Sequence, residues 1–274
     1  MWRDPHAEHD RNHPHGRQAD GVAASNFAAN HDGLVLWFAP MSIWRKIASA
    51  ASRLTTGGPL GALGRAISGR LAGGRAAPEC QVVFTIGVIA LSAKMAKADG
   101  VVTCDEVAAF RQIFAVPPEE MRNVTRVFNY AKRDTAGFEA YARQLAGLLG
   151  NRPGILEDVL DGLFRIATAD GVLHPREIAY LEEVGRLFDI SDARFARIRA
   201  RHAPPDEGDP YVVLGVDRDR RLDEIKRIYR RLVAESHPDR LIARGVPEEF
   251  IEIANHRVAA LNAAWERIRA EHTA

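Results

Sequence analysis

Cysteine is scarce in this sequence. Among 274 residues there are only two, Cys80 and Cys104. Two thiols cannot complete a zinc cluster by themselves, and they do not make a disulfide framework. Both lie near apolar helical stretches, which predicts buried, unreactive thiols. Together with an opening segment that lacks the pattern of a secretory signal, this predicts a cytoplasmic protein.

Long apolar runs are also missing. In the Gly- and Ala-rich residues 41–78, the longest uncharged run, Leu54 to Gly64, has 11 residues, whereas about 20 are needed to cross a bilayer. Arg53, Arg65 and Arg70 interrupt the segment, and an arginine at mid-membrane costs about 2.5–3.5 kcal/mol. A spanning helix is therefore excluded. Two alternatives remain: a flexible linker, or a helix lying peripherally on anionic lipid at the inner face of the membrane.

The chain has no strong charge of one sign. Net charge is +1 overall, made of −2 in residues 1–40, +6 in 41–78, −3 in 79–208 and 0 in 209–274. No folded region is basic enough for a general nucleic-acid binder, so we expect no nucleic-acid partner. Hydrophobic residues make up 46% of the chain, which is ample for a packed core.

Residues 1–32 are polar, follow no period and hold five of the ten histidines. A metal-binding tract is one interpretation. The alternative is that residues 1–40 are disordered, or that they are upstream DNA translated from a start codon chosen too early. This alternative is favoured because Met41 begins a segment of different composition.

Residues 79–203 are predicted to be entirely helical. Apolar residues recur at helical spacing, and Gly, Pro or Asp stands at most boundaries. The predicted helices are Val82–Ala98, Asp105–Ala115, Glu119–Lys132, Phe138–Leu149, Ile155–Ala169, Arg176–Phe188 and Asp192–His202.

The same region contains an internal repeat. Residues 95–107 align without gaps on residues 166–178, and each copy is a helix end, an Asp-Gly turn and a new helix start. Gly100 and Gly171 suit the left-handed conformation that closes a helix. Thr103 and Glu106 match a capping box. The repeat predicts two helix pairs related by a pseudo-twofold axis.

Residues 204–274 predict a helical hairpin. After a stiff Pro-rich connector and a short helix near Tyr211, a basic amphipathic helix runs from about Leu222 to Ser236. Pro238 cannot continue that helix, so His237 and Asp239 project from a stiff turn beside a cationic face, which indicates a binding surface. The cationic positions are Lys226, Arg227, Arg230 and Arg231.

A loop through Gly245 is expected to lead to the last helix, about Glu248 to Ala270. Its apolar stripe should pack antiparallel on the apolar face of the basic helix. The stripe comprises Ile251, Ala254, Val258, Leu261, Trp265 and Ile268. The facing residues are Ile225, Ile228, Tyr229 and Leu232.

The ordered run from Asp209-Pro210-Tyr211 through the basic helix to His237-Pro238-Asp239 resembles the J-domain of DnaJ-type co-chaperones. This resemblance implies docking on a DnaK-type chaperone through the His-Pro-Asp segment and the four cationic residues, and stimulation of ATP hydrolysis by that partner. The Gly/Phe-rich segment and the Cys-x-x-Cys zinc module of larger DnaJ proteins are missing. An enzyme is not expected, because His237 and Asp239 lack a convergent nucleophile and oxyanion donor.

The duplicated Ala-Asp-Gly pattern resembles TerB-like domains, which precede the J-domain in DjlA-type proteins. Some TerB-like proteins are thought to bind metal through acidic residues, and the positions here are Asp99, Glu106, Asp170 and Glu177. The spacing is not that of an EF-hand, and the alternative is that these acids cap helix starts. No cofactor is otherwise expected. We predict that the TerB-like domain recruits a client or location; the alternative function is a metal- or stress-responsive adaptor.

Overall fold

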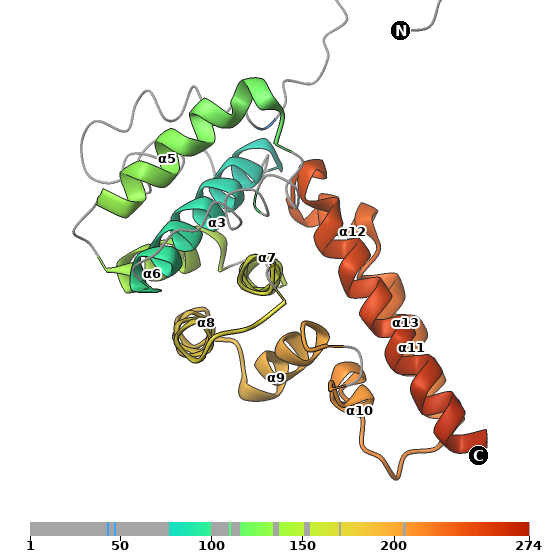
Figure 1. Cartoon of the computed structure of the whole chain (residues 1–274). Helices are drawn as coiled ribbons and strands as arrows, with labels where there is room; N and C mark the ends of the chain where they lie inside the picture. The colour runs from blue at the N-terminus through green and yellow to red at the C-terminus, as the bar shows by residue number, and fades with distance from the viewer. Residues whose placement is uncertain are drawn as a thin grey trace, which may run out of the picture. The chain divides into compact units, whose positions relative to one another are not determined.

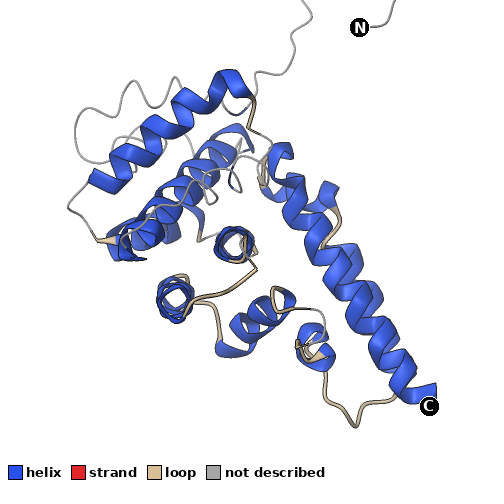
Figure 2. Cartoon of the chain, viewed as in Figure 1, coloured by secondary structure: helices blue, strands red, loops and turns tan. Residues whose placement is uncertain are grey.

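The computed structural model describes Ile43, Ile47, Phe110 and residues 77–99, 116–133, 137–150, 154–169, 171–204 and 207–273. Over these residues every regular element is a helix and none is a strand, so the predicted all-α class is confirmed (Figure 2). Several predictions fall outside the described residues. These are residues 1–40, the linker or interfacial segment within 41–78, the helix 105–115 apart from Phe110, and the turn of the first repeat copy.

The TerB-like half is built on α3 (Ala77–Asp99), which begins five residues before the predicted start (Figure 1). A 3-10 turn, η1 (Pro118–Glu120), leads into the next helix. The later helices agree with the predicted ones within two residues at each end. They are α5 (Met121–Arg133), α6 (Phe138–Leu149), α7 (Ile155–Ala167), α8 (Pro175–Leu187) and α9 (Asp192–Arg201).

The C-terminal part contains α10 (Pro210–Leu214), α11 (Leu222–Glu235), α12 (Pro238–Arg244), η2 (Glu248–Phe250) and α13 (Ile251–Thr273). The expectation of a loop from the His-Pro-Asp segment to Gly245 is wrong, because α12 occupies that stretch. The reason is local: a proline suits the first turn of a helix, and Gly245 closes the helix with a φ of 106°.

Helix α3 is the centre of the main core. It packs against α5, α6, α7 and α8, and its fully buried side chains include Phe84, Ile86 and Ile89. The hydroxyl of Tyr180 on α8 donates to the Leu91 carbonyl at 2.8 Å, which satisfies both buried polar groups. Cys80 is fully buried, as predicted, and its thiol donates to the Arg244 carbonyl at 3.9 Å, whereas Cys104 lies outside the described residues. None of the helices in the described part of the chain has the length and hydropathy of a membrane span.

A second, smaller core joins α10, α11 and α13 through Ile225, Leu261, Trp265 and Ile268. The predicted antiparallel packing of α13 on α11 is therefore confirmed for the second half of the apolar stripe. The first half differs, because Ile253 and Ala254 belong to the main core together with Phe250, whose ring meets Phe84 edge-on at 5.1 Å. One helix thus contributes to both cores.

Residues Pro40–Ala274 accordingly form one compact unit. The contacts that α13 makes with α7 and α9, and that α12 makes with α7, cross the boundary expected at residues 203 and 204.

Candidate functional site

The segment that leads into the basic helix is held by short-range hydrogen bonds. The Asp209 carboxylate caps α10 by accepting from the Tyr211 amide at 2.9 Å, and Pro210 occupies the first helical turn. Arg218 pairs with Asp209 at 2.9 Å and lies over the Tyr211 ring. The Tyr211 hydroxyl donates to Glu271 at 3.0 Å, which ties α10 to the last turns of α13.

The His-Pro-Asp segment forms the start of α12. Helix α11 ends at Glu235, and the buried Ser236 closes it by donating its amide to the Leu232 carbonyl at 3.0 Å. His237 is the N-cap of α12, and its Nδ1 accepts from the Asp239 amide at 3.3 Å. This bond orients the imidazole and leaves the His237 and Asp239 side chains 61% and 86% exposed. Both groups are open to a partner.

The four predicted cationic residues of α11 are all exposed. Arg231 lies 3.9 Å from Glu235, one helical turn away. Within the described part of the chain, no carboxylate lies within ion-pair distance of Lys226, Arg227 or Arg230. The structure therefore presents these cations and the His-Pro-Asp segment on one continuous stretch of surface, α11 followed by the start of α12.

Side-chain contacts hold the scaffold beneath this surface. The Tyr229 ring on α11 stacks on Trp265 of α13 with centroids 5.3 Å apart, and its hydroxyl donates to Asn262 at 2.8 Å. At the other end of α12, Arg244 donates to the Glu235 carbonyl at 3.2 Å. The His-Pro-Asp segment is thus fixed from both sides by its neighbouring helices.

A cluster of buried charges joins α7, α9 and α13, and we call it the junction cluster. Its central residue is Asp161, which accepts from Arg201 at 3.1 Å, from Arg257 at 2.9 Å and from the His202 ring at 2.9 Å. Arg257 also donates to Asp158 at 2.8 Å. The cluster comprises Asp158, Asp161, Arg201, His202 and Arg257.

The charges of the junction cluster balance, with two carboxylates against two guanidinium groups. Burial by itself would raise the pKa of Asp161, but Arg201, Arg257 and the His202 hydrogen bond outweigh it and hold that pKa well below its usual range. Burial lowers the pKa of His202, against the opposing effect of Asp161. His256 stacks on His202 at 4.7 Å; burial first, and then repulsion from His202 when that ring is protonated in acid, lowers the pKa of His256 to about 4. The histidines are therefore neutral at pH 7.

The junction cluster reaches the His-Pro-Asp segment through α12. Arg244 lies 3.7 Å from Asp158, and the same guanidinium bonds the end of α11. Sequence reasoning missed this cluster, because its members are up to 99 positions apart. The available signal was a pair of aspartates three positions apart in a mostly apolar helix, Asp158 and Asp161 in α7.

The four acidic residues that the sequence suggested for metal binding are only partly described. Glu177 is buried, and its carboxylate accepts from the His174 amide at 3.0 Å at the start of α8, which is how a helix-capping glutamate behaves. Glu106, Asp170 and the side chain of Asp99 lie outside the described residues. No group of three or more metal-ligating side chains occurs among the described ones, and metal binding by this set stays a prediction.

Comparison with known proteins agrees with this arrangement. The tellurite resistance protein TerB family matches residues 85–200, and the DnaJ domain family matches residues 209–266. No solved structure matches.

Three relatives match most of the chain. A co-chaperone protein DjlA from Photobacterium profundum is 30% identical over 219 residues, which are 70% of this chain and 79% of that protein. The DjlA co-chaperones of Vibrio cholerae and Coxiella burnetii are 27% and 26% identical over 74% and 70% of this chain, and over 83% and 78% of their own lengths. The chain, in which a TerB-like domain is followed by a DnaJ domain, therefore belongs to the DjlA family of co-chaperones.

Proposed function

We propose that the chain docks on a DnaK-type chaperone through α11 and the His-Pro-Asp segment, and that docking accelerates ATP hydrolysis by that partner. One observation carries the proposal: His237 and Asp239 are exposed at the start of α12, directly beside an exposed cationic helix, while the backbone around them is fixed. The surface that a partner contacts is therefore preorganised, so little conformational entropy is lost on binding.

Each group has a distinct physical role in this proposal. Lys226, Arg227 and Arg230 attract an acidic surface on the partner, which raises the association rate more than the final affinity. The Asp239 carboxylate accepts charge-assisted hydrogen bonds from a partner arginine. His237 accepts the Asp239 amide and so holds the carboxylate in place. Pro238 fixes the first turn of α12.

Within this proposal no covalent bond is broken by the chain itself. The hydrolysis belongs to the partner, whose conformational equilibrium shifts because docking favours one of its states. A hydrolytic site at His237 gains no support from the geometry, since the neighbouring Ser236 is buried at the end of α11 and His237 Nδ1 is engaged with the backbone.

The TerB-like half recruits a client in this account. Helix α13 belongs to both cores, and the junction cluster ties it to α7 and α9. A client held by the TerB-like half is then brought to the DnaK-type partner on the same chain as the docking surface. An adaptor that senses metal through the TerB-like half is not favoured by any contact among the described residues.

The test is single-turnover ATP hydrolysis by a DnaK-type chaperone, measured with the wild-type chain and with His237→Gln. Wild type should accelerate hydrolysis, and His237→Gln should leave the partner at its basal rate. His272→Gln, near the end of α13, is the matched control and should behave as wild type. Equal acceleration by wild type and His237→Gln would place the activity elsewhere.

A further inference from the structure

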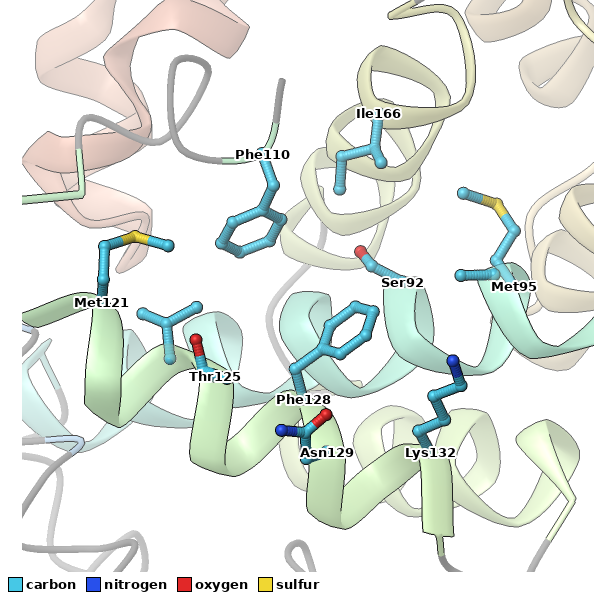
Figure 3. A pocket seen from close by; sticks show the side chains of 11 residues that line it. Ser92, Met95, Phe110, Met121, Thr125, Phe128, Asn129, Lys132 and Ile166 are labelled. Carbon is cyan, nitrogen blue, oxygen red and sulfur yellow. The ribbon is translucent and has the colours of Figure 1, made fainter. Parts of the chain in front are cut away.

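The TerB-like half contains a hollow between α3, α5 and α7 (Figure 3). Its volume is about 200 Å³, and most of its lining is apolar. Met95, Met121, Phe128 and Ile166 line it from three different helices, and Phe110 lines it as well. The junction cluster and the His-Pro-Asp segment do not line it. A function for this hollow is therefore a separate question.

The size of the hollow limits what it can hold. Sites for cofactors and drug-sized molecules commonly measure about 300–1,000 Å³. A cavity of about 150 Å³ is enough for a benzene ring. At about 200 Å³ this hollow fits one aromatic or branched aliphatic side chain, together with little else.

One wall of the hollow is a cationic helix, from which Lys132 lines the hollow itself. Helix α5, which forms one wall, carries Arg122, Arg126, Lys132 and Arg133 and has no acidic residue. In Figure 3 the Lys132 side chain extends from α5 toward Met95 at the mouth. The polar rim residues Thr125 and Asn129 are exposed on the same helix.

A second, more open hollow lies along α5, and Asn129 lines both. Its other lining residues include Arg126 and Arg133, both exposed. A chain that places an apolar side chain in the first hollow would therefore pass directly over guanidinium groups. Guanidinium groups bind carboxylates by paired hydrogen bonds.

We propose that the hollow between α3, α5 and α7 anchors one large apolar side chain of a partner polypeptide that carries acidic residues beside it. The anchor is buried in the hollow, and the acidic neighbours pair with Arg126, Lys132 and Arg133. Recognition by a single deep anchor with a charged rim is a common way to bind a peptide segment. This inference deepens the proposed recruitment of a client, since it names the surface and the chemistry of the segment.

Binding of short fluorescein-labelled peptides to the full chain, followed by fluorescence anisotropy, tests the proposal. The peptides carry a central Leu, Phe or Trp flanked by Glu. Matched peptides carry Ala at the centre, or Lys in place of Glu. The Glu-flanked peptides with a large apolar centre should bind at least about tenfold more tightly than either matched set, the change expected for one anchor or one charge-assisted contact.

Two variants locate the site. Ala96→Leu adds side-chain volume at a small residue that lines the hollow, so it should fill the hollow, keep or raise the melting temperature, and weaken peptide binding about thirtyfold. Lys132→Glu should weaken binding about tenfold at low salt and less at high salt. Arg176→Glu, an exposed change on α8, is the control and should bind as wild type.

Several results would overturn the proposal: no binding by any peptide, equal binding of the Ala-centred set, or unchanged binding by Ala96→Leu. Displacement of the peptide by dodecanoate at equal affinity would assign the hollow to a fatty acyl chain instead. If Ala96→Leu does not fold, the effect of Lys132→Glu decides. Failure of the co-chaperone proposal is distinguishable, because His237→Gln should bind peptide normally and Ala96→Leu should still accelerate hydrolysis by a DnaK-type partner.

Discussion

Two groups of charged side chains in this molecule are similar in composition and opposite in surroundings. The α11 surface, with the His-Pro-Asp segment, combines arginines, a histidine and an aspartate that are exposed. The junction cluster combines the same residue types, and its side chains are at most 8% exposed. Exposed charges interact weakly with one another and stay available to a partner, whereas buried charges must be paired where they stand.

This contrast shows that residue type does not decide the role of a charge. A buried ion pair is often no more stabilising than apolar residues of the same volume, yet removal of one partner is costly. The junction cluster therefore fixes how α13 packs on α7 and α9, because other packings would leave a buried charge unpaired. The predictions below separate the two roles.

The largest expected effect comes from breaking the junction cluster. Arg257→Met leaves Asp158 and Asp161 with fewer partners in a buried site and should lower the free energy of unfolding by about 3–5 kcal/mol. Arg269→Met, on an exposed face of the same helix, should change it by less than about 0.5 kcal/mol. Chemical denaturation followed by circular dichroism measures both, and equal stabilities would show that the cluster is not structural.

A smaller loss is expected where α12 meets the main core. Gly245 has a φ of 106°, and a Cβ there would lie 2.7 Å from the Cys80 sulfur, so Gly245→Ala should cost about 2–3 kcal/mol through strain and overlap. Gly171→Ala has a similar φ of 87° with open space around it, so it should cost only the strain, about 1 kcal/mol. Equal melting temperatures of the two variants would contradict a close contact between Gly245 and Cys80.

Acid should weaken the packing of α13 at the junction. The pKa of His256 is about 4 in the fold and about 6.5 in the unfolded chain, so acidification protonates the unfolded chain first. The free energy of unfolding should be constant above about pH 6.5 and should fall as the pH is lowered toward 4. The part of this loss due to His256 should be about 1–2 kcal/mol, because solvent screening reduces the effect of a partly exposed group. The lowered pKa of His202 adds in the same direction.

His256→Phe keeps an aromatic ring against His202 and removes the titrating group. The variant should therefore lose stability less steeply than wild type between pH 6.5 and pH 4, as measured by thermal unfolding at several pH values. Parallel pH profiles for the two proteins would contradict the assignment.

The smallest expected effect is on association at the α11 surface. Arg227→Glu and Arg230→Glu should each slow association with a DnaK-type chaperone by about tenfold at low salt, leave the melting temperature unchanged, and approach wild type at high salt. Arg176→Glu has the same charge change on α8 and should associate at the wild-type rate. Stopped-flow association kinetics give this comparison, and an effect of Arg176→Glu of equal size would indicate nonspecific attraction.

The exposed surface was predictable from sequence, because its signal is local. Periodic apolar residues define α11, Pro238 ends it, and His237 and Asp239 are adjacent to both. The helical nature of α12 was not predicted. A proline cannot continue one helix but can occupy the first turn of the next, and the sequence alone indicates only the first of these roles here.

The junction cluster and the division of α13 between two cores were not predictable in the same way. Pairing of Arg257 with Asp161 depends on how three helices from distant parts of the sequence come together, and periodicity carries no information on that. The stripe on α13 predicted burial at Ile251, whereas the fully packed residue is Ile253, because the first half of the helix faces the TerB-like core.

A matched pair of substitutions tests the division of roles most directly. Asp239→Asn and Asp161→Asn make the same chemical change, one on the exposed surface and one in the junction cluster. Melting temperature and single-turnover ATP hydrolysis by a DnaK-type chaperone are measured for both, at a temperature where each is folded. Asp239→Asn should abolish the acceleration and melt as wild type, whereas Asp161→Asn should melt earlier and still accelerate hydrolysis. Acceleration retained by Asp239→Asn would contradict the account.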